Sequence, residues 1–126
     1  MKTAFATLAA LLVALATHIT AQPCQAQQGQ YRIQGIWDAH YMLGGMPAYE
    51  RLVLTHTGTF TKRCMWNGNM AFHTGQYLVG PSFLRLVHDR GPIRSETWEI
   101  RFLGPDRVLC RDHVMGTAWT MQRVGP

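Results

Sequence analysis

The chain has 126 residues, of which 12 are Lys or Arg and 7 are Asp or Glu, so its net charge is +5 with histidine neutral. This length accommodates one domain and excludes a TIM barrel, which needs roughly 250 residues. Charged residues make up only 15% of the chain, against about 25% in a typical soluble domain, which excludes a highly charged disordered protein.

The first 21 residues have the features of a secretory signal. Lys2 precedes an apolar run from Ala4 to Ala16 that only Thr7 interrupts. The run is shorter than the roughly 20 apolar residues of a membrane-spanning helix. We therefore expect residues 1–21 to be a signal peptide cleaved after Ala21, with Ala26 as the second choice. The protein is expected to be exported, to the periplasm or the extracellular space, with no membrane span.

Signal removal would leave a modestly basic chain. Eleven cations against seven acids give +4, and every cation except Lys62 is an arginine. The arginines are dispersed, as on a solvated surface, and together with the export signal this argues against nucleic-acid binding. Residues 22–30 are rich in Gln and poor in apolar residues, so we expect a flexible lead-in to a folded domain over 31–126.

From residue 31 onward the sequence predicts strands rather than helices. No window of ten or more residues has a helical period, and short runs rich in β-branched and aromatic residues alternate with Gly, Pro, Asn and Asp. Asn67-Gly68 is the strongest hairpin signal, and residues 44–47 are expected to form a break. The eight predicted strands span residues 31–41, 48–56, 59–66, 70–79, 82–88, 94–103, 107–113 and 117–124.

The links between these strands are too short for parallel pairing, which needs crossovers of a dozen residues or more. A sequential antiparallel sheet of this size loses its free edges by closing on itself. In residues 97–102 apolar and polar side chains alternate, so Trp98, Ile100 and Phe102 should face inward and Glu99 and Arg101 outward. The predicted fold is all-β, an eight-stranded antiparallel up-and-down barrel, with a two-sheet β-sandwich as the second choice.

Motifs along these strands resemble those of small bacterial lipocalin-like (calycin) domains. Gly35-Ile36-Trp37 is similar to the Gly-x-Trp signature of that family. Later segments that look like family motifs are Leu52-Val53-Leu54, Thr57-Gly58-Thr59-Phe60, Gly75-Gln76-Tyr77, Trp98-Glu99-Ile100 and Trp119 with Arg123. In the family, an arginine on the last strand packs over the first-strand tryptophan and closes the barrel. The resemblance implies this role for Arg123 over Trp37, a contact that is physically favourable, and makes Gly35, Trp37 and Arg123 the structural signature.

Three cysteines bear on the topology. Cleavage after Ala21 would leave Cys24, Cys64 and Cys110, whereas cleavage after Ala26 would leave only the last two. For a protein in an oxidising compartment, the sequence leaves two alternatives, one disulfide or buried free thiols. In the implied barrel, Cys64 and Cys110 lie on opposite walls, farther apart than the Cα separation of about 5.5–6 Å that a disulfide requires. A Cys64–Cys110 bond would therefore contradict the round barrel.

Six aromatic residues on the predicted inward face are the candidate ligand-binding residues. They are Trp37, Phe60, Tyr77, Trp98, Phe102 and Trp119. An eight-stranded barrel is either filled by side chains or holds one small ligand. The sequence does not distinguish between these two interiors.

Histidine and methionine are expected to be structural. The histidines outside the signal (40, 56, 73, 88 and 113) lack metal-ligand spacing and are expected as polar surface residues of strands and turns. The six methionines outside it (42, 46, 65, 70, 115 and 121) are expected as core filler. A cuprous-ion site on these soft sulfur atoms is the alternative.

Catalysis has little support, because the acids are scattered and neither Ser82 nor Ser95 lies in a nucleophile elbow. The expected function is binding of a small apolar or amphipathic ligand by an exported monomer, without cofactor or metal. The alternative is a periplasmic protein-interaction or proteinase-inhibitor barrel with a filled core, in which residues 22–30 contact the partner. Metal or haem binding ranks third.

Overall fold

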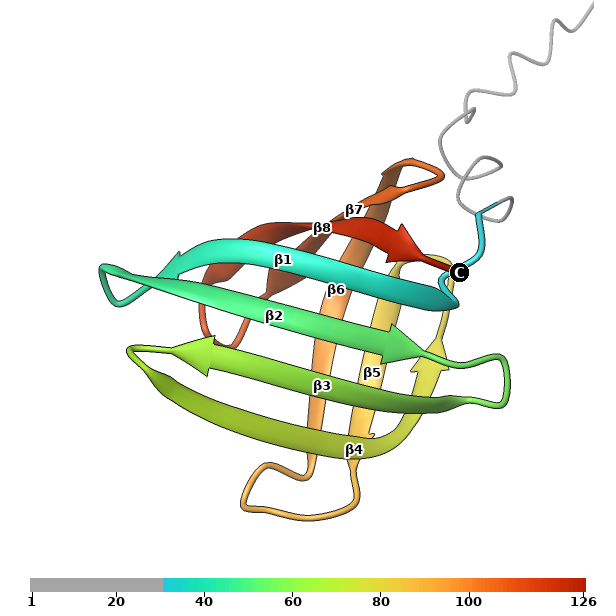
Figure 1. Ribbon diagram of the computed structural model, residues 1–126. Helices are drawn as coiled ribbons and strands as arrows, with labels where there is room; N and C mark the ends of the chain where they lie inside the picture. The colour runs from blue at the N-terminus through green and yellow to red at the C-terminus, as the bar shows by residue number, and fades with distance from the viewer. Residues whose placement is uncertain (1–30) are drawn as a thin grey trace, which may run out of the picture.

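Eight antiparallel strands in sequential order form a closed barrel in the computed structural model, which describes residues 31–126 (Figure 1). The strands are β1 (Gly35–Leu43), β2 (Met46–Leu54), β3 (Thr59–Trp66), β4 (Asn69–Val79), β5 (Phe83–His88), β6 (Ser95–Gly104), β7 (Arg107–Asp112) and β8 (Thr117–Gly125). The predicted fold class is confirmed, and the sandwich alternative is wrong. The predicted signal peptide, its lead-in and Cys24 lie outside the described residues.

Two-residue turns connect the strands of the first hairpin, β1–β2, and of the third, β3–β4. Gly44 and Gly45 have φ of 58° and 76°, and Asn67 and Gly68 have φ of 50° and 74°. Two successive positive φ angles match the right-handed twist of the flanking strands, which is why such turns contain Gly and Asn. The predicted break at 44–47 is therefore too long, because Met46 and Pro47 already belong to β2. Pro47 is tolerated because it lies beyond Ala48–Trp66, the last β2–β3 pair.

The first strand begins later than the sequence predicts. Residues 31–34 precede β1, and the Ile33 carbonyl accepts a 2.7 Å hydrogen bond from Trp37 Nε1. Gly35 has a φ of 138°, where a side chain is strained. A Cβ atom there would also collide with the Arg123 guanidinium. The chain therefore bends at Gly35 before it enters the sheet.

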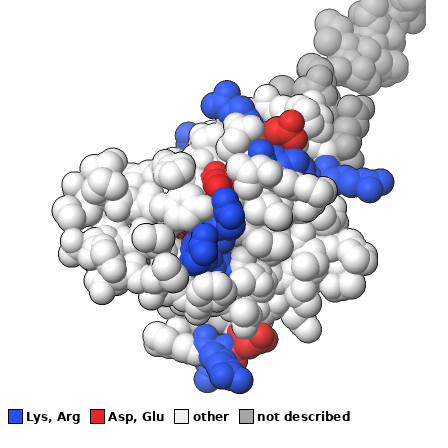
Figure 2. Space-filling model, in the orientation of Figure 1, with Lys and Arg blue, Asp and Glu red and all other residues white. Residues whose placement is uncertain are grey.

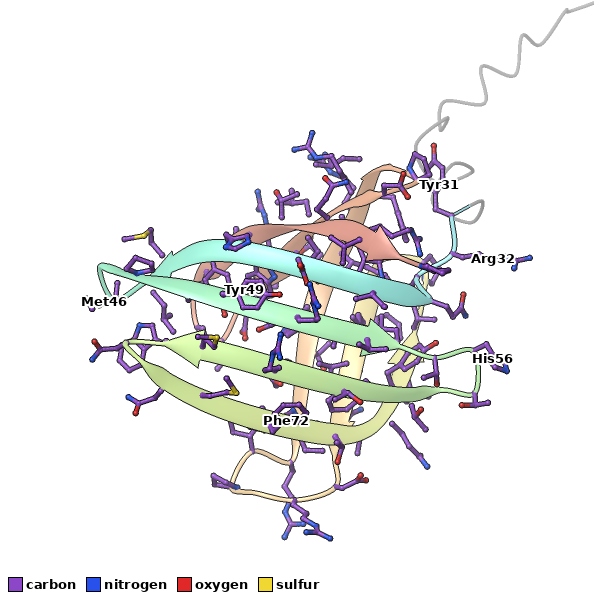
Figure 3. The ribbon with its side chains drawn as sticks, in the orientation of Figure 1. Tyr31, Arg32, Met46, Tyr49, His56 and Phe72 are labelled. Atoms are coloured by element: carbon purple, nitrogen blue, oxygen red, sulfur yellow. The ribbon has the colours of Figure 1, made fainter. Side chains whose placement is uncertain are left out.

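The barrel has two ends of different character. One end, here called the open end, carries the hairpin turns β1–β2, β3–β4 and β7–β8 and the loop between β5 and β6. The other, the closed end, carries the remaining three turns and both ends of the described chain. Figure 3 shows Met46 at the tip of the β1–β2 hairpin and His56 in the β2–β3 turn at the opposite end.

Large apolar side chains fill the closed end. Trp37, Leu52, Leu84, Leu86 and Val108 are fully buried within one continuous core cluster, which extends from this end to the middle of the barrel. The Arg123 guanidinium carbon lies 4.3 Å from the centroid of the Trp37 ring. Arg123 also donates hydrogen bonds to the carbonyls of Arg32, Gln34 and Pro105. The expected signature contact between the last and first strands is thus confirmed, and it covers the base of the barrel.

Gly75 is the point at which β4 passes from pairing with β3 to pairing with β5. It is paired with Phe60 on one side and His88 on the other. A Cβ atom there would overlap the Val87 carbonyl and lie 2.8 Å from the Phe60 ring. The absence of a side chain at this position lets the two neighbouring strands approach closely.

Candidate functional site

A cavity of about 200 Å³ occupies the open end of the barrel. Its lining combines ionisable groups with aromatic and aliphatic side chains. The lining residues are Tyr41, Leu43, Ala48, Glu50, Lys62, Cys64, Met65, Trp66, Glu96, Trp98, Asp112, Met115, Thr117 and Trp119. A cavity of about 150 Å³ holds benzene, so this one has room for a ring-sized group with a polar substituent.

The cavity lies where the β1–β8 ladder has ended. The last pair of that ladder toward the open end is Ala39–Met121. Beyond it, residues 40–43 of β1 and 117–120 of β8 have no pairing with each other. Tyr41 and Leu43 from β1, and Thr117 and Trp119 from β8, are the residues that line the cavity on this side. The end of the ladder therefore separates the filled half of the barrel from the hollow half.

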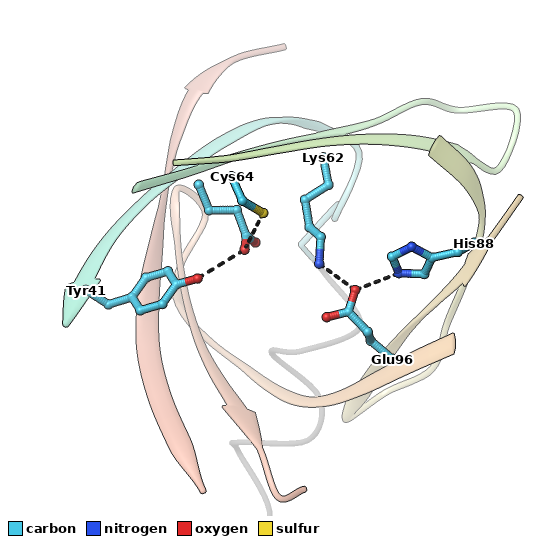
Figure 4. A network of polar contacts seen from close by, with 6 residues as sticks. Tyr41, Lys62, Cys64, His88 and Glu96 are labelled. Atoms are coloured by element: carbon cyan, nitrogen blue, oxygen red, sulfur yellow. Dashed lines mark hydrogen bonds and ion pairs between the residues drawn. The ribbon is translucent and has the colours of Figure 1, made fainter. Parts of the chain in front are cut away.

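One group of buried charges centres on Glu96 (Figure 4). Its Oε2 atom lies 2.5 Å from Lys62 Nζ and 2.7 Å from His88 Nε2. Burial raises the pKa of the Glu96 carboxyl, but the charge and hydrogen bond of Lys62 outweigh burial and bring that pKa below its ordinary value. Burial likewise disfavours the charged form of Lys62, yet the charges of Glu50 and Glu96 leave its pKa raised. Lys62 and Glu96 therefore form a partly buried ion pair at neutral pH.

A second group centres on Glu50, which is 3% exposed. The Tyr41 hydroxyl lies 3.4 Å and the Cys64 thiol 3.6 Å from Glu50 Oε2, as hydrogen-bond donors (Figure 4). Burial is the main cause that raises the pKa of the Glu50 carboxyl, and the Lys62 charge opposes it only in part. Burial also raises the pKa of the Cys64 thiol to about 12. Glu50 and Cys64 thus favour their neutral forms, in contrast to Glu96.

Three polar atoms of the cavity residues have no partner among the described residues. They are Glu50 Oε1 and the indole nitrogens of Trp98 and Trp119. The other two tryptophans of the chain are satisfied, because Trp37 Nε1 donates to the Ile33 carbonyl and Trp66 Nε1 donates to the Leu43 carbonyl. A buried polar group without a hydrogen bond costs about 1–3 kcal/mol. A ligand group that reached any of these three atoms would remove that cost, as would a partner for Arg63 Nε or His88 Nδ1, which belong to residues outside the lining.

The six predicted ligand-binding residues divide between the two ends. Trp98 and Trp119 line the cavity, with their ring centroids 5.0 Å apart in an edge-to-face arrangement. Trp37, Phe60 and Tyr77 are buried in the core cluster, and Phe102 packs against it. The structure thus brings two of the six to the cavity and places four outside its lining.

The polar residues of the cavity are the part that the sequence analysis missed. Strand alternation contains the signal for them: Glu50 is two residues before inward-facing Leu52, Lys62 two after Phe60, His88 two after Leu86 and Glu96 two before Trp98. The expectation of surface histidines is wrong for His88, which is 7% exposed, because its even spacing from Leu84 and Leu86 turns it inward.

The expectation that the methionines fill the core is wrong for five of the six. Only Met121 is buried. The others lie at or next to the hairpin tips, beyond the last packed layer of side chains. Met42, Met46, Met65, Met70, Val114 and Met115, between 39% and 93% exposed, form what we call the apolar rim. In Figure 2, the end of the molecule that carries the β1–β2 and β3–β4 hairpins shows almost no charged side chain.

Cys64 and Cys110 are free thiols on β3 and β7. This agrees with the expectation that a bond between them and a round barrel exclude each other. Cys110 is fully buried, and burial raises its thiol pKa. Within residues 31–126, no three His, Cys, Asp or Glu side chains are grouped as metal ligands. No helix in the same part of the chain has the length and apolarity to cross a membrane.

Comparison with models of known protein families gave no match, and comparison with curated proteins gave no similar sequence. The closed eight-stranded antiparallel barrel is compatible with a lipocalin-like fold.

Proposed function

We propose that this protein is an exported, lipocalin-like binding protein that holds one small amphipathic molecule in the open end of its barrel. The observation that carries the proposal is the cavity of about 200 Å³, whose lining includes three buried polar atoms without partners. Ligand pockets combine an apolar lining with a few polar groups that fix orientation. Leu43, Ala48 and Met65 supply the apolar surface here, and the Glu50 and Lys62 regions supply the polar end.

The layout of the barrel supports binding of a small rather than a long ligand. The closed end is filled by the core cluster and covered by Arg123, so a ligand has only the open half to occupy. The cavity is also below the roughly 300–1,000 Å³ of pockets for drug-sized molecules. Export rests on the basic start and apolar run of residues 1–21, which mass analysis of the mature protein from an expressing cell tests directly.

A cavity-filling variant tests the binding site. Ala48→Phe puts a ring into the cavity, whereas Ala118→Phe places the same ring on an exposed outer position of β8. We expect benzene-sized amphiphiles to bind the parent and Ala118→Phe proteins in calorimetry, and not Ala48→Phe. Melting curves of both variants verify that the barrel is retained. Equal binding by a folded Ala48→Phe protein would exclude the cavity as the site.

The apolar rim favours a second candidate function, inhibition of a proteinase or binding of another protein. Exposed apolar groups gathered at one end of a domain are typical of interaction surfaces. Inhibition assays against a panel of secreted bacterial proteinases test this candidate. Inhibition that depends on dose, and that Met42→Ser with Met70→Ser abolishes, would support it over the carrier function.

A further inference from the structure

We infer that the polar end of the cavity recognises a carboxylate, so that the ligand is a small organic acid with an apolar body. This inference rests on the proposed function and assigns its ligand class. It follows from the kind of hydrogen-bonding groups that the cavity leaves unpaired.

The unpaired groups are predominantly donors. An indole N–H can only donate, and those of Trp98 and Trp119 have no acceptor among the described residues. Lys62 carries three N–H protons, and its one hydrogen-bond acceptor in the described part of the chain is Glu96. A ligand that satisfies this cavity must therefore bring several acceptor lone pairs close together, which a carboxylate does.

Glu50 adds a further donor in its neutral form. Oε2 faces the donors of Tyr41 and Cys64, so a proton on the carboxyl is best placed on the unpartnered Oε1. The charged and titratable groups around Glu50 come from four strands: Tyr41 on β1, Lys62 and Cys64 on β3, Glu96 on β6 and Cys110 on β7. Burial raises the pKa of Glu50, which favours the protonated donor form and removes its repulsion of an incoming anion.

The other two acids of the lining each have one oxygen already engaged by protein groups. Glu96 Oε2 contacts both Lys62 and His88. Asp112 Oδ1 accepts hydrogen bonds from the backbone N–H groups of Val114 and Met115. The net charge of +5 on the chain also attracts anions. An amine, by contrast, would leave both indole N–H groups unpaired.

Three matched probes test the inference: phenylacetate, the uncharged phenylacetamide and the cationic phenethylamine. We expect calorimetry at pH 6 to show phenylacetate binding at least tenfold more tightly than the other two. Its affinity should decrease as pH rises through the raised pKa of Glu50, because the ionised Glu50 repels it. In Glu50→Gln the amide still donates, so binding should persist and this pH dependence should disappear.

The four tryptophans provide an internal control. In nitrogen–proton NMR spectra, phenylacetate should shift the indole signals of Trp98 and Trp119 and leave that of Trp37, which lies outside the lining, nearly unchanged. Trp119→Phe should weaken phenylacetate binding at least fivefold. Trp66→Phe removes the same group from another cavity residue, but one whose N–H is already bonded to Leu43, and should have little effect.

The outcomes separate the two proposals. Tighter binding of phenethylamine, or equal binding of phenylacetamide, would overturn the carboxylate assignment and leave the cavity as a ligand site of another chemistry. Binding by none of the probes, or by no amphiphile of this size in the parent protein, would overturn the proposed function as well.

Discussion

Two glutamates of the cavity, buried Glu50 and half-buried Glu96, should respond in opposite ways to the same substitution. Glu96→Gln removes the charge that faces Lys62, whose side chain is 6% exposed. Breaking a buried ion pair by removing one partner costs about 3–5 kcal/mol. Because the Glu96 side chain is 18% exposed, we expect the lower limit, about 3 kcal/mol. In a domain of this size each kcal/mol lowers the melting temperature by about 4–8 °C, so the expected decrease at pH 7 is about 12–24 °C.

The pH dependence follows from the direction of each pKa shift. The pKa of Glu96 lies below its ordinary value of 4.5, so its contribution is present above pH 4.5 and is lost as pH falls through the lowered pKa. The difference in unfolding free energy between the parent protein and Glu96→Gln should therefore become smaller at acid pH. The pKa of Glu50 is raised, so the parent protein loses stability as pH rises from 4.5 through that pKa. Glu50→Gln avoids this loss and should be at least as stable as the parent at pH 7.

Thermal and denaturant unfolding, followed by circular dichroism between pH 3 and pH 8, measures both effects. Glu99→Gln is the matched control, because Glu99 lies on the outer face of β6 and its side chain is hydrogen-bonded to the exposed His113. Equal destabilisation by Glu50→Gln and Glu96→Gln at pH 7, or a difference for Glu96→Gln that does not become smaller at acid pH, would refute the assigned charge states.

Three further predictions concern the closed end and the thiols. Arg123→Ala should lower the unfolding free energy by about 3 kcal/mol, because it removes a cation–π contact and three charge-assisted hydrogen bonds. The control, Arg85→Ala at an exposed position, should change the unfolding free energy by less than about 0.5 kcal/mol. Equal effects of the two substitutions would contradict the role of Arg123. Gly75→Ala should lower the unfolding free energy by about 3 kcal/mol or more, because the added Cβ overlaps the Val87 carbonyl. Gly104→Ala has no atom within 4 Å of the added Cβ, so it should leave the unfolding free energy nearly unchanged in the same denaturation assay. In Cys24→Ser protein, fully buried Cys110 should react with Ellman's reagent at pH 8 far more slowly than in denaturant. Half-buried Cys64 should also react slowly, because its pKa is raised to about 12 and little thiolate is present. Rapid reaction of Cys110 would disprove its burial, and rapid reaction of Cys64 would disprove its raised pKa.

The fold could be predicted because its signals are local. Turn residues such as Asn67-Gly68 and the alternation around Trp98 act over a few positions, and every link is short enough to require antiparallel neighbours. The strand ends were harder to predict. β1 starts at Gly35, and the Ile33 carbonyl before it accepts a hydrogen bond from the Trp37 indole, a contact that no local pattern reveals. The pairing of Arg123 with Trp37 was expected through the family resemblance and not from periodicity.

The candidate site was predicted only in its aromatic half. Trp98 and Trp119 were expected as ligand-binding residues, and both line the cavity. Glu50, Lys62 and Glu96 were overlooked because a charged residue ordinarily marks the outer face of a strand. Which interior positions stay hollow depends on where the β1–β8 ladder ends, at Ala39–Met121. The packing of all eight strands sets where this ladder ends. A short stretch of sequence does not contain that information.

The closing ladder between β1 and β8 has a consequence for folding. Within residues 31–126, every other ladder joins strands that follow each other in sequence, and this one joins strands more than 80 residues apart. Loop-closure entropy makes such a contact slow to form. An open eight-stranded sheet, in which β1 and β8 are unpaired edge strands, should therefore precede the closed barrel. Bare edges are templates for aggregation. The contact of Arg123 with Trp37 therefore also shortens the lifetime of that open sheet. Weakening the contact should increase losses to aggregation during refolding, in addition to lowering the stability of the folded barrel.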